Sequence, residues 1–157
     1  MKLELFADYY QFYLQDDDLA VGDFSDAWNR EAVCRVRIAV VPGCVAIATA
    51  RNTTVRVELV FSEVEPALAH DSWSHIVEAD MLCNTGRIVV AGCTDYFPDA
   101  RRCPVKPGRH RVRVFYGFGT RAADGFGDLM DYRVDVWPIE APRPVVILKQ
   151  GPFPWSG

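Results

Sequence analysis

Residue types that can do chemistry gather in one short stretch of the sequence. Residues 70–75, His-Asp-Ser-Trp-Ser-His, place two histidines, an acid and two hydroxyl groups within six positions. On a β-strand, side chains an odd number of positions apart point to opposite faces, so His70 and His75 could bind one metal ion only if the strand began after His70. We therefore interpret the stretch as a polar turn that leads into a strand.

The cysteines are a second source of chemistry. Their odd number and the lack of a Cys-x-x-Cys pair indicate a reducing compartment, and we expect buried, unreactive thiols with no metal and no cofactor. A nucleophile pair of Cys93 or Cys103 with His110 has no local signature. The hypothesis of a hydrolase that uses His70, His75 or His110 is therefore supported by residue types alone. The five cysteines are Cys34, Cys44, Cys83, Cys93 and Cys103.

A glycine-rich stretch matches a nucleotide-binding pattern. Residues 117–122, Gly-Phe-Gly-Thr-Arg-Ala, have the form G-x-G-x-x-A. That pattern binds a dinucleotide only where a helix opens at the glycines and a parallel strand follows. Residues 123–128, Ala-Asp-Gly-Phe-Gly-Asp, are instead typical of a loop, so we predict no nucleotide site.

Acidic side chains are concentrated near the N-terminus. The net charge is −4, and residues 1–31 alone carry two basic and eight acidic side chains. Asp16, Asp17 and Asp18 form the densest run. Three adjacent carboxylates at a strand end could contribute to a Ca²⁺ site, although such a site needs six to eight oxygens. They could instead occupy the basic DNA track of a nuclease by imitating the nucleic-acid backbone.

Basic side chains are concentrated between residues 101 and 113, where six are present and no acidic one. Arg109, Arg111 and Arg113 alternate along an expected strand and would share one face. No aromatic residue lies between them to stack bases, and the whole chain is acidic, with a pI of about 5.3. We predict no direct contact with nucleic acid and expect cross-strand pairs with acids such as Glu58 or Asp135.

Alternation of apolar and polar residues is the main structural pattern. Residues 55–61, 109–116 and 132–136 alternate with a period of two and are expected to be strands with one solvated face. Shorter runs at 9–15, 73–82, 87–90 and 145–148 are further expected strands. The turn residues 84–86, Asn-Thr-Gly, look like a hairpin connection. The pattern predicts an all-β fold, an antiparallel β-sandwich.

One short helix is expected beside the strands. Ser25 or Asp26 could cap a helix that places Phe24, Trp28 and Ala32 on one face, and this helix would cover one end of the sandwich. Residues 33–41 are ambiguous, and we favour a strand. The expected domain spans residues 1–137, and the proline-rich segment 138–157 is expected to pack on the same domain.

Length and hydropathy restrict the class of protein. A chain of 157 residues is expected to form one domain with a sizeable core. The longest uncharged apolar stretch, residues 38–50, is shorter than the roughly 20 residues of a membrane helix. Glu4 and Asp8 interrupt the N-terminal apolar residues before a signal peptide could form, so we expect no membrane association and a cytoplasmic location.

Several segments together resemble the competence protein J family, whose best-known member inhibits the DNA-entry nuclease of competent bacteria. They are residues 3–5 and 9–16, the helix start at 24–26, residues 43–53, the strand 86–90 and residues 106–112. Tyr10-Gln11-Phe12 and Arg51-Asn52-Thr53 are the distinctive parts. The resemblance spans roughly residues 3 to 137, and it implies binding to a partner protein and no catalytic residues.

The leading hypothesis is a non-catalytic module that binds a protein partner, like a nuclease inhibitor or an immunity protein. Its acidic N-terminal segment would face a basic partner. The alternative is a β-sandwich that binds Ca²⁺ or a small ligand through its rim loops. The candidate partner-binding residues are Asp16, Asp17, Asp18, Asp23, Asp26, Tyr13, Arg51 and Asn52.

Overall fold

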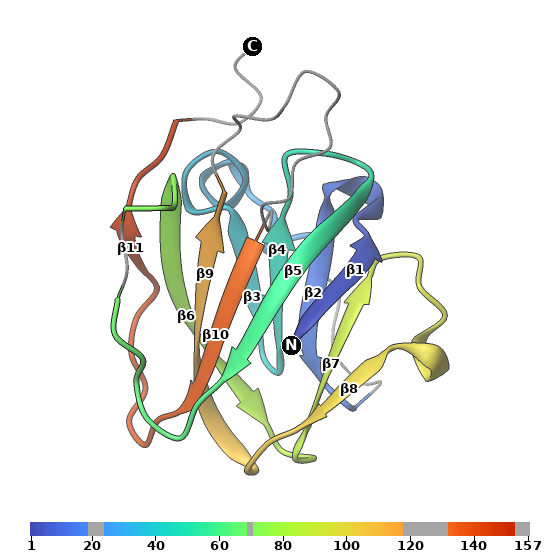
Figure 1. Cartoon of the computed structure of the whole chain (residues 1–157), viewed down its shortest axis with the longest axis vertical. Helices are drawn as coiled ribbons and strands as arrows, with labels where there is room; N and C mark the ends of the chain where they lie inside the picture. The colour runs from blue at the N-terminus through green and yellow to red at the C-terminus, as the bar shows by residue number, and fades with distance from the viewer. Residues whose placement is uncertain (19–23, 69–70, 118–131, 153–157) are drawn as a thin grey trace.

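Two β-sheets packed face to face make up the protein in a computed structural model that describes residues 1–18, 24–68, 71–117 and 132–152 (Figure 1). The six-stranded sheet has the order β1 (Lys2–Phe6), β5 (Thr54–Phe61), β10 (Tyr132–Pro138), β9 (Gly108–Tyr116), β6 (His75–Cys83) and β11 (Val146–Lys149). The five-stranded sheet has the order β3 (Ile38–Val41), β4 (Cys44–Ala48), β2 (Gln11–Asp16), β7 (Arg87–Gly92) and β8 (Arg101–Pro104). This architecture confirms the all-β sandwich.

The core lies between the two sheets and follows the alternation in the sequence. Along β5, Val55, Val57 and Leu59 are buried, while the residues between them are half-buried on the outer face. Val112 and Val114 of β9 contribute in the same way. Burial of apolar side chains from both inner faces is the main stabilising term of such a sandwich.

One pair of strands departs from the antiparallel expectation. β5 and β10 are parallel neighbours, with Val57 beside Tyr132 and Leu59 beside Val134. The other pairings among the described strands that give a register are antiparallel. Parallel partners need a long connection, and here that connection contains the whole stretch from β6 to β9.

The turn at residues 84–86 is not the expected hairpin. β6 belongs to the six-stranded sheet and β7 to the five-stranded sheet, so this turn carries the chain from one sheet to the other. Gly86 has φ +76, a left-handed conformation that glycine adopts without strain. We call residues 84–86 the inter-sheet corner.

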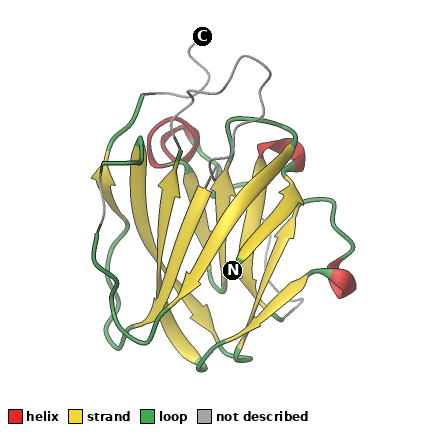
Figure 2. Ribbon diagram, in the orientation of Figure 1, coloured by secondary structure: helices red, strands yellow, loops and turns green. Residues whose placement is uncertain are grey.

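The short helix is present, but it begins later than expected. Residues 24–28 form turns, in which Ala27 and Trp28 donate backbone hydrogen bonds to the carbonyl of Phe24. The side chain of Asn29 then accepts a hydrogen bond from the Ala32 amide at 3.0 Å, and a π-helical segment, Ala32–Val36, follows (Figure 2). The strand expected at residues 33–41 is therefore wrong over its first half, because this helical segment precedes β3.

The C-terminal segment lies against the edge of the six-stranded sheet, where β11 pairs with β6. Beyond β11, the backbone of Gly151 packs so closely on β6 that an added Cβ would lie 2.3 Å from the carbonyl oxygen of Ser74. The Gly151 amide donates to Nδ1 of His75 at 3.2 Å. Among the described residues, no helix is both long and apolar enough to span a membrane.

Candidate partner-binding surface

Asp16 lies at the end of β2 and holds the inter-sheet corner in place. Its carboxylate accepts hydrogen bonds from the amides of Asn84 at 2.7 Å and Thr85 at 3.2 Å, from the Thr85 hydroxyl and from the Cys83 thiol. Burial alone would raise the pKa of Asp16, but these hydrogen bonds to the charged form dominate and lower it. Asp16 was expected to face a partner, but it is 4% exposed and stabilises the inter-sheet corner.

Replacing Asp16 by asparagine is expected to lower the free energy of unfolding by about 1–3 kcal/mol, because an amide cannot accept all four hydrogen bonds of the corner. Chemical denaturation followed by tryptophan fluorescence measures the loss. Asp26→Asn is the matched control, since Asp26 is exposed, and it is expected to change stability by less than about 0.5 kcal/mol. Equal stability of the two variants would show that the corner does not depend on the carboxylate.

Asp17 and Asp18 follow at the same end of β2. Asp17 accepts hydrogen bonds from Arg87 at 2.7 Å and from Arg102 at 3.2 Å, and these two arginines lower its pKa. Asp18 is exposed. Asp23, which belongs to the same predicted set, lies outside the described residues. The acidic run therefore combines a buried carboxylate, an ion-paired one and an exposed one.

Tyr13 lies in the middle of β2 and on the outer face of the five-stranded sheet. Its ring stacks on Phe24 with the centroids 5.3 Å apart. Burial and a hydrogen bond with Cys93 raise the pKa of Tyr13, so the phenol stays protonated. Asp26 follows Phe24 by two positions in the sequence and is exposed.

An apolar groove of about 390 Å³ lies at the opposite end of β2. Its wall includes Tyr9 and Tyr10, which are 69% and 47% exposed, and Trp28, whose indole donates to Gln11 at 2.9 Å. Tyr9 and Tyr10 have φ of 55° and 60°. Left-handed backbone is unfavourable for tyrosine, and residues with such strain cluster at functional sites. The sequence patterns did not predict that Tyr9 and Trp28 line a groove.

Arg51 and Asn52 are exposed and lie at this aromatic end, far from Asp16. Ala48 pairs with Gln11 at the start of β2, whereas Cys44 pairs with Gln15 near its end. The structure therefore separates the predicted set into two groups. The acidic run lies at one end of β2, and Arg51 and Asn52 lie at the other.

The arginines of β9 do not form the expected solvated face. Arg111 and Arg113 are 1% and 3% exposed. Both donate to Glu78 of β6, at 2.9 and 2.7 Å, and Arg111 also donates to Asp80 at 2.8 Å. The pairing with acids is as expected, but the acids are Glu78, Asp80 and, for Arg113, also Glu65 at 3.1 Å, whereas Glu58 and Asp135 were expected.

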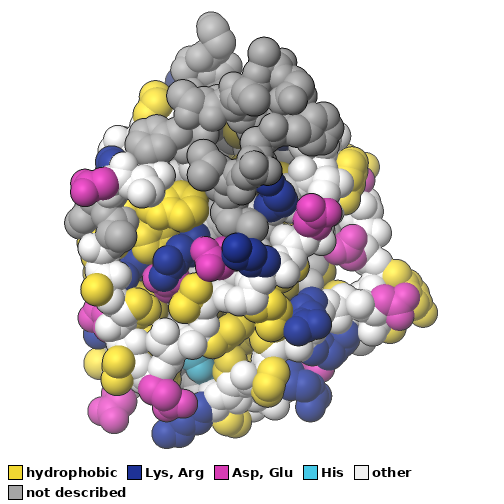
Figure 3. All heavy atoms as spheres, in the orientation of Figure 1, with side chains coloured by type: hydrophobic (Ala, Val, Ile, Leu, Met, Phe, Trp, Pro, Cys, Tyr) yellow, Lys and Arg dark blue, Asp and Glu magenta, His cyan; other side chains and the backbone are white. Residues whose placement is uncertain are grey.

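Two chain segments cover these arginines from outside. Arg113 donates to the carbonyl of Pro66 at 3.0 Å, and Arg111 donates to the carbonyl of Pro144 at 2.8 Å. Arg113 also lies over the ring of Trp137, 4.8 Å from its centroid. On the surface of this face, basic and acidic side chains are interspersed (Figure 3). We call Arg111, Arg113, Glu78 and Asp80 the ionic ladder.

The described histidines are buried, and the cysteines form no disulfide. His75 and His110 are buried, and burial lowers the pKa of each; His70 lies outside the described residues. Cys44, Cys83 and Cys103 are buried, whereas Cys34 and Cys93 are exposed. Within residues 1–18, 24–68, 71–117 and 132–152, no three His, Cys, Asp or Glu side chains are placed to hold a metal ion.

Comparisons with known proteins find similarity at the level of structure. ComJ from Bacillus subtilis, an inhibitor of the DNA degrading activity of NucA, matches with a TM-score of 0.67 over 88% of this chain and 96% of its own, at 15% identity. The product of crocagin biosynthetic gene J matches over the same shares, with a TM-score of 0.58 and 13% identity. No family model matches the sequence, and no curated protein is significantly similar. The chain thus shares its fold with ComJ.

Proposed function

We propose, with the ComJ-like fold as the premise, that this protein is a non-catalytic binding protein that inhibits a nuclease. The observation that carries the proposal is the match to a nuclease inhibitor over 88% of this chain and nearly all of ComJ. An inhibitor of this kind needs a stable scaffold and an accessible binding surface, with no reacting groups. The reducing compartment indicated by the cysteines is compatible with a cytoplasmic inhibitor.

The acidic side of β2 is the surface that we assign to the basic partner. Asp17, Asp18 and Asp26 supply negative charge, and Tyr13 with Phe24 supplies aromatic contact area. Charges at the rim of an interface mainly accelerate association, whereas aromatic anchors provide most of the affinity. Asp16 contributes indirectly, because it fixes the end of the strand that carries its neighbours.

Affinity capture from the native cell lysate at low and moderate salt tests the function. We expect the protein to retain a basic nuclease in near-stoichiometric amount, with its DNase activity suppressed in the complex and restored on release. Recovery of a nuclease that is equally active bound and free would contradict inhibition. If no nuclease is retained at either salt concentration, the protein shares with ComJ its fold but not its function.

The triple variant Asp17→Asn, Asp18→Asn and Asp26→Asn is expected to slow association with the captured nuclease about tenfold at low salt and to flatten its salt dependence. Stopped-flow measurements at several salt concentrations give both quantities. The matched control, Glu58→Gln, Glu63→Gln and Glu140→Gln, changes the net charge equally but acts on the six-stranded sheet and its loops. Equal slowing by both triple variants would show that net charge matters and the acidic side of β2 does not.

A further inference from the structure

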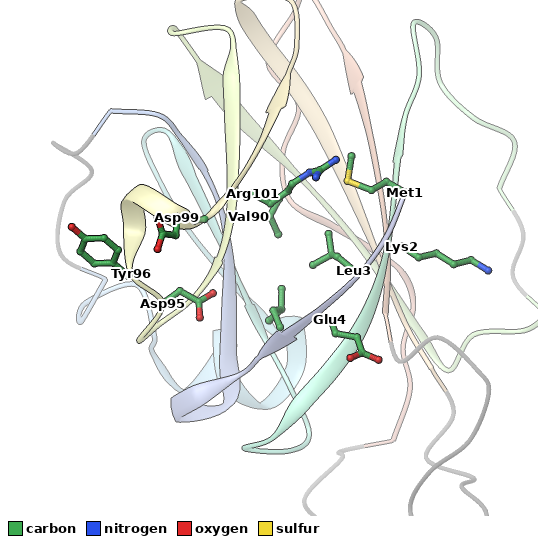
Figure 4. A pocket seen from close by; sticks show the side chains of 11 residues that line it. Met1, Lys2, Leu3, Glu4, Val90, Asp95, Tyr96, Asp99 and Arg101 are labelled. Atoms are coloured by element: carbon green, nitrogen blue, oxygen red, sulfur yellow. The ribbon is translucent and has the colours of Figure 1, made fainter.

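Positive and negative groups lie together in two parts of this protein. The ionic ladder is one of them, and the cleft of about 490 Å³ beside β1 is the other (Figure 4). Because both signs line the cleft, it selects neither a cationic nor an anionic occupant. The charged groups that line it are the Met1 ammonium, Lys2 and Arg101, and Glu4, Asp95 and Asp99.

Arg37 is a buried charge without such a companion. The residue is 3% exposed, and within residues 1–18, 24–68, 71–117 and 132–152 no carboxylate pairs with it. Its guanidinium lies over the ring of Tyr116, 5.8 Å from the centroid, and its Nε–H has no hydrogen-bond partner among the same residues. A buried charge is costly unless hydrogen bonds compensate it. The position of Arg37 therefore depends on the groups that accept its remaining N–H donors.

The C-terminal residues 150–152, which we call the clasp, provide such acceptors. Nη2 of Arg37 donates to the carbonyl of Gly151 at 3.0 Å and to the carbonyl of Pro152. The clasp is itself anchored on β6, because the Gly151 amide donates to Nδ1 of His75 at 3.2 Å. It lies at the end of the sandwich where the helical segment lies (Figure 2). The clasp therefore joins the buried arginine to the six-stranded sheet.

Arg37 ends the segment 24–36, which lies on the outer face of the five-stranded sheet and which we call the covering segment. Its amide donates to the Ala32 carbonyl at 2.7 Å, and its own carbonyl accepts the Ala48 amide at 2.9 Å and the Tyr116 hydroxyl at 2.6 Å. Arg37 has φ 67°, a left-handed conformation that is unfavourable for a residue with a side chain. Such a conformation persists only where the surrounding structure over-determines it. Here the sheet holds the backbone, and the clasp holds the side chain.

The covering segment carries residues of both candidate contact areas. Phe24 stacks on the ring of Tyr13 beneath it. Trp28 and Val33 line the apolar groove. The amide of Trp28 donates to the Phe24 carbonyl at 3.2 Å, and the Val33 amide donates to the carbonyl of Asn29 at 3.0 Å. These backbone hydrogen bonds connect the contact residues to the helical turn that ends at the next element, β3.

We propose that the clasp is a conformational device that fixes the covering segment through Arg37. When the clasp is closed, its carbonyls accept hydrogen bonds from the buried guanidinium and hold the left-handed turn. When it is open, the guanidinium loses these acceptors, so the side chain turns toward water and the helical turn loosens. The link to partner binding rests on the proposed function. The clasp itself follows from the contacts of Arg37 and Gly151.

Gly151→Ala opens the clasp without removing a side chain that it uses. The added Cβ would lie 2.3 Å from the carbonyl oxygen of Ser74, so the backbone of the clasp must move away from β6. Amide hydrogen exchange measured by NMR is the readout. We expect exchange at Val33 and Arg37, the reporter amides, to accelerate at least about tenfold, which corresponds to the loss of one hydrogen bond.

Two controls accompany this variant. Pro152→Ala keeps both carbonyls of the clasp and should leave the reporter amides within about twofold of the wild type. The amides of Asp16 and Val105, which donate to backbone carbonyls at the far end of the sandwich, report global unfolding and should exchange as in the wild type. Unchanged exchange at the reporter amides of Gly151→Ala would overturn the proposal. Equal acceleration at Asp16 and Val105 would overturn it as well, because the effect would then be global.

Arg37→Met tests whether the clasp acts through the buried guanidinium. The unbranched methionine side chain carries no charge, so it does not need the carbonyls of the clasp. In this background we expect Gly151→Ala to accelerate exchange at Val33 less than about threefold, against about tenfold in the wild-type background. Equal acceleration in both backgrounds would show that the clasp does not act through Arg37.

Measurements with a captured nuclease separate this inference from the proposed function. Gly151→Ala is expected to weaken binding of the nuclease about fivefold, whereas Pro152→Ala should bind like the wild type. If exchange accelerates at the reporter amides but the affinity is unchanged, the clasp stands and its link to the partner surface is wrong. If no nuclease is captured, the proposed function fails, and the exchange experiments still decide whether the clasp exists.

Discussion

Replacing Glu78 by alanine is expected to lower the free energy of unfolding by about 3–5 kcal/mol. Glu78 is the shared acceptor of the ionic ladder, with one oxygen 2.9 Å from Nε of Arg111 and the other 2.7 Å from Nε of Arg113. Both guanidinium groups are almost completely buried. Without Glu78, two positive charges would lie close together under the chain segments that cover them, with less compensation.

Glu58→Ala is the matched control for this variant. Glu58 lies on the outer face of β5 in the same sheet and is half-buried, and its side chain makes no hydrogen bond or ion pair with another described residue. Denaturation at neutral pH should give a much smaller loss for Glu58→Ala. A quadruple variant, Glu78→Leu with Asp80→Asn, Arg111→Met and Arg113→Met, should recover most of the stability, because it removes all four charges of the ionic ladder together. A small loss for Glu78→Ala alone would show that Asp80 and the covering carbonyls suffice.

Acidification from about pH 6.5 to pH 4 is expected to reduce stability by about 3 kcal/mol through His75 alone. His75 is fully buried. Burial and the neighbouring charge of Arg37 lower its pKa from 6.5 to about 4, against a smaller opposing effect of the Val36 carbonyl. Between these two pKa values His75 is protonated in the unfolded chain but neutral in the folded protein. The free energy of unfolding therefore falls as the pH falls. Above about pH 6.5 both states are neutral, and this contribution is constant.

The tautomer of His75 explains why protonation is resisted. Nδ1 accepts the Gly151 amide at 3.2 Å, so the ring proton resides on Nε2, which donates to the Val36 carbonyl at 3.1 Å. A second proton on Nδ1 would face the Gly151 N–H. His75→Gln, which does not titrate, is expected to flatten the acid limb of a plot of stability against pH. His110, whose pKa burial also lowers, contributes in the same direction, and His110→Gln measures its share. An unchanged slope for His75→Gln would contradict the assignment.

The strands could be predicted from the sequence because alternation reports which side chains share a face. Residues 55–61, 109–116 and 132–136 are strands for this reason. Alternation does not report what covers a face. The arginines of β9 alternate like solvated residues, but segments distant in sequence, around Pro66 and Pro144, lie over them. Their burial is a property of the tertiary structure.

The candidate surface could be predicted only in part, because the sequence reports local charge but not tertiary contacts. The local charge marks residues 16–18, but not that the hydrogen bonds of the inter-sheet corner would bury Asp16. The strand β1 was missed altogether, because residues 2–6 were not among the expected strands, and its place at the edge of a sheet depends on neighbours that the sequence does not report. The late helix start at Asn29 was hidden as well, since Ser25 and Asp26 are equally good caps by residue type.

The parallel neighbours β5 and β10 have a consequence for the order of folding. Val57 and Tyr132 are partners although almost half of the chain lies between them, so their pairing must overcome a large loop-closure entropy. The β3–β4 hairpin, by contrast, joins residues that are close in sequence. We infer that the middle of the six-stranded sheet closes late, after β9 and β6 have paired, and that folding is correspondingly slow for a domain of this size. Until that closure, β5 has only β1 beside it, and the nascent sheet has an additional open edge.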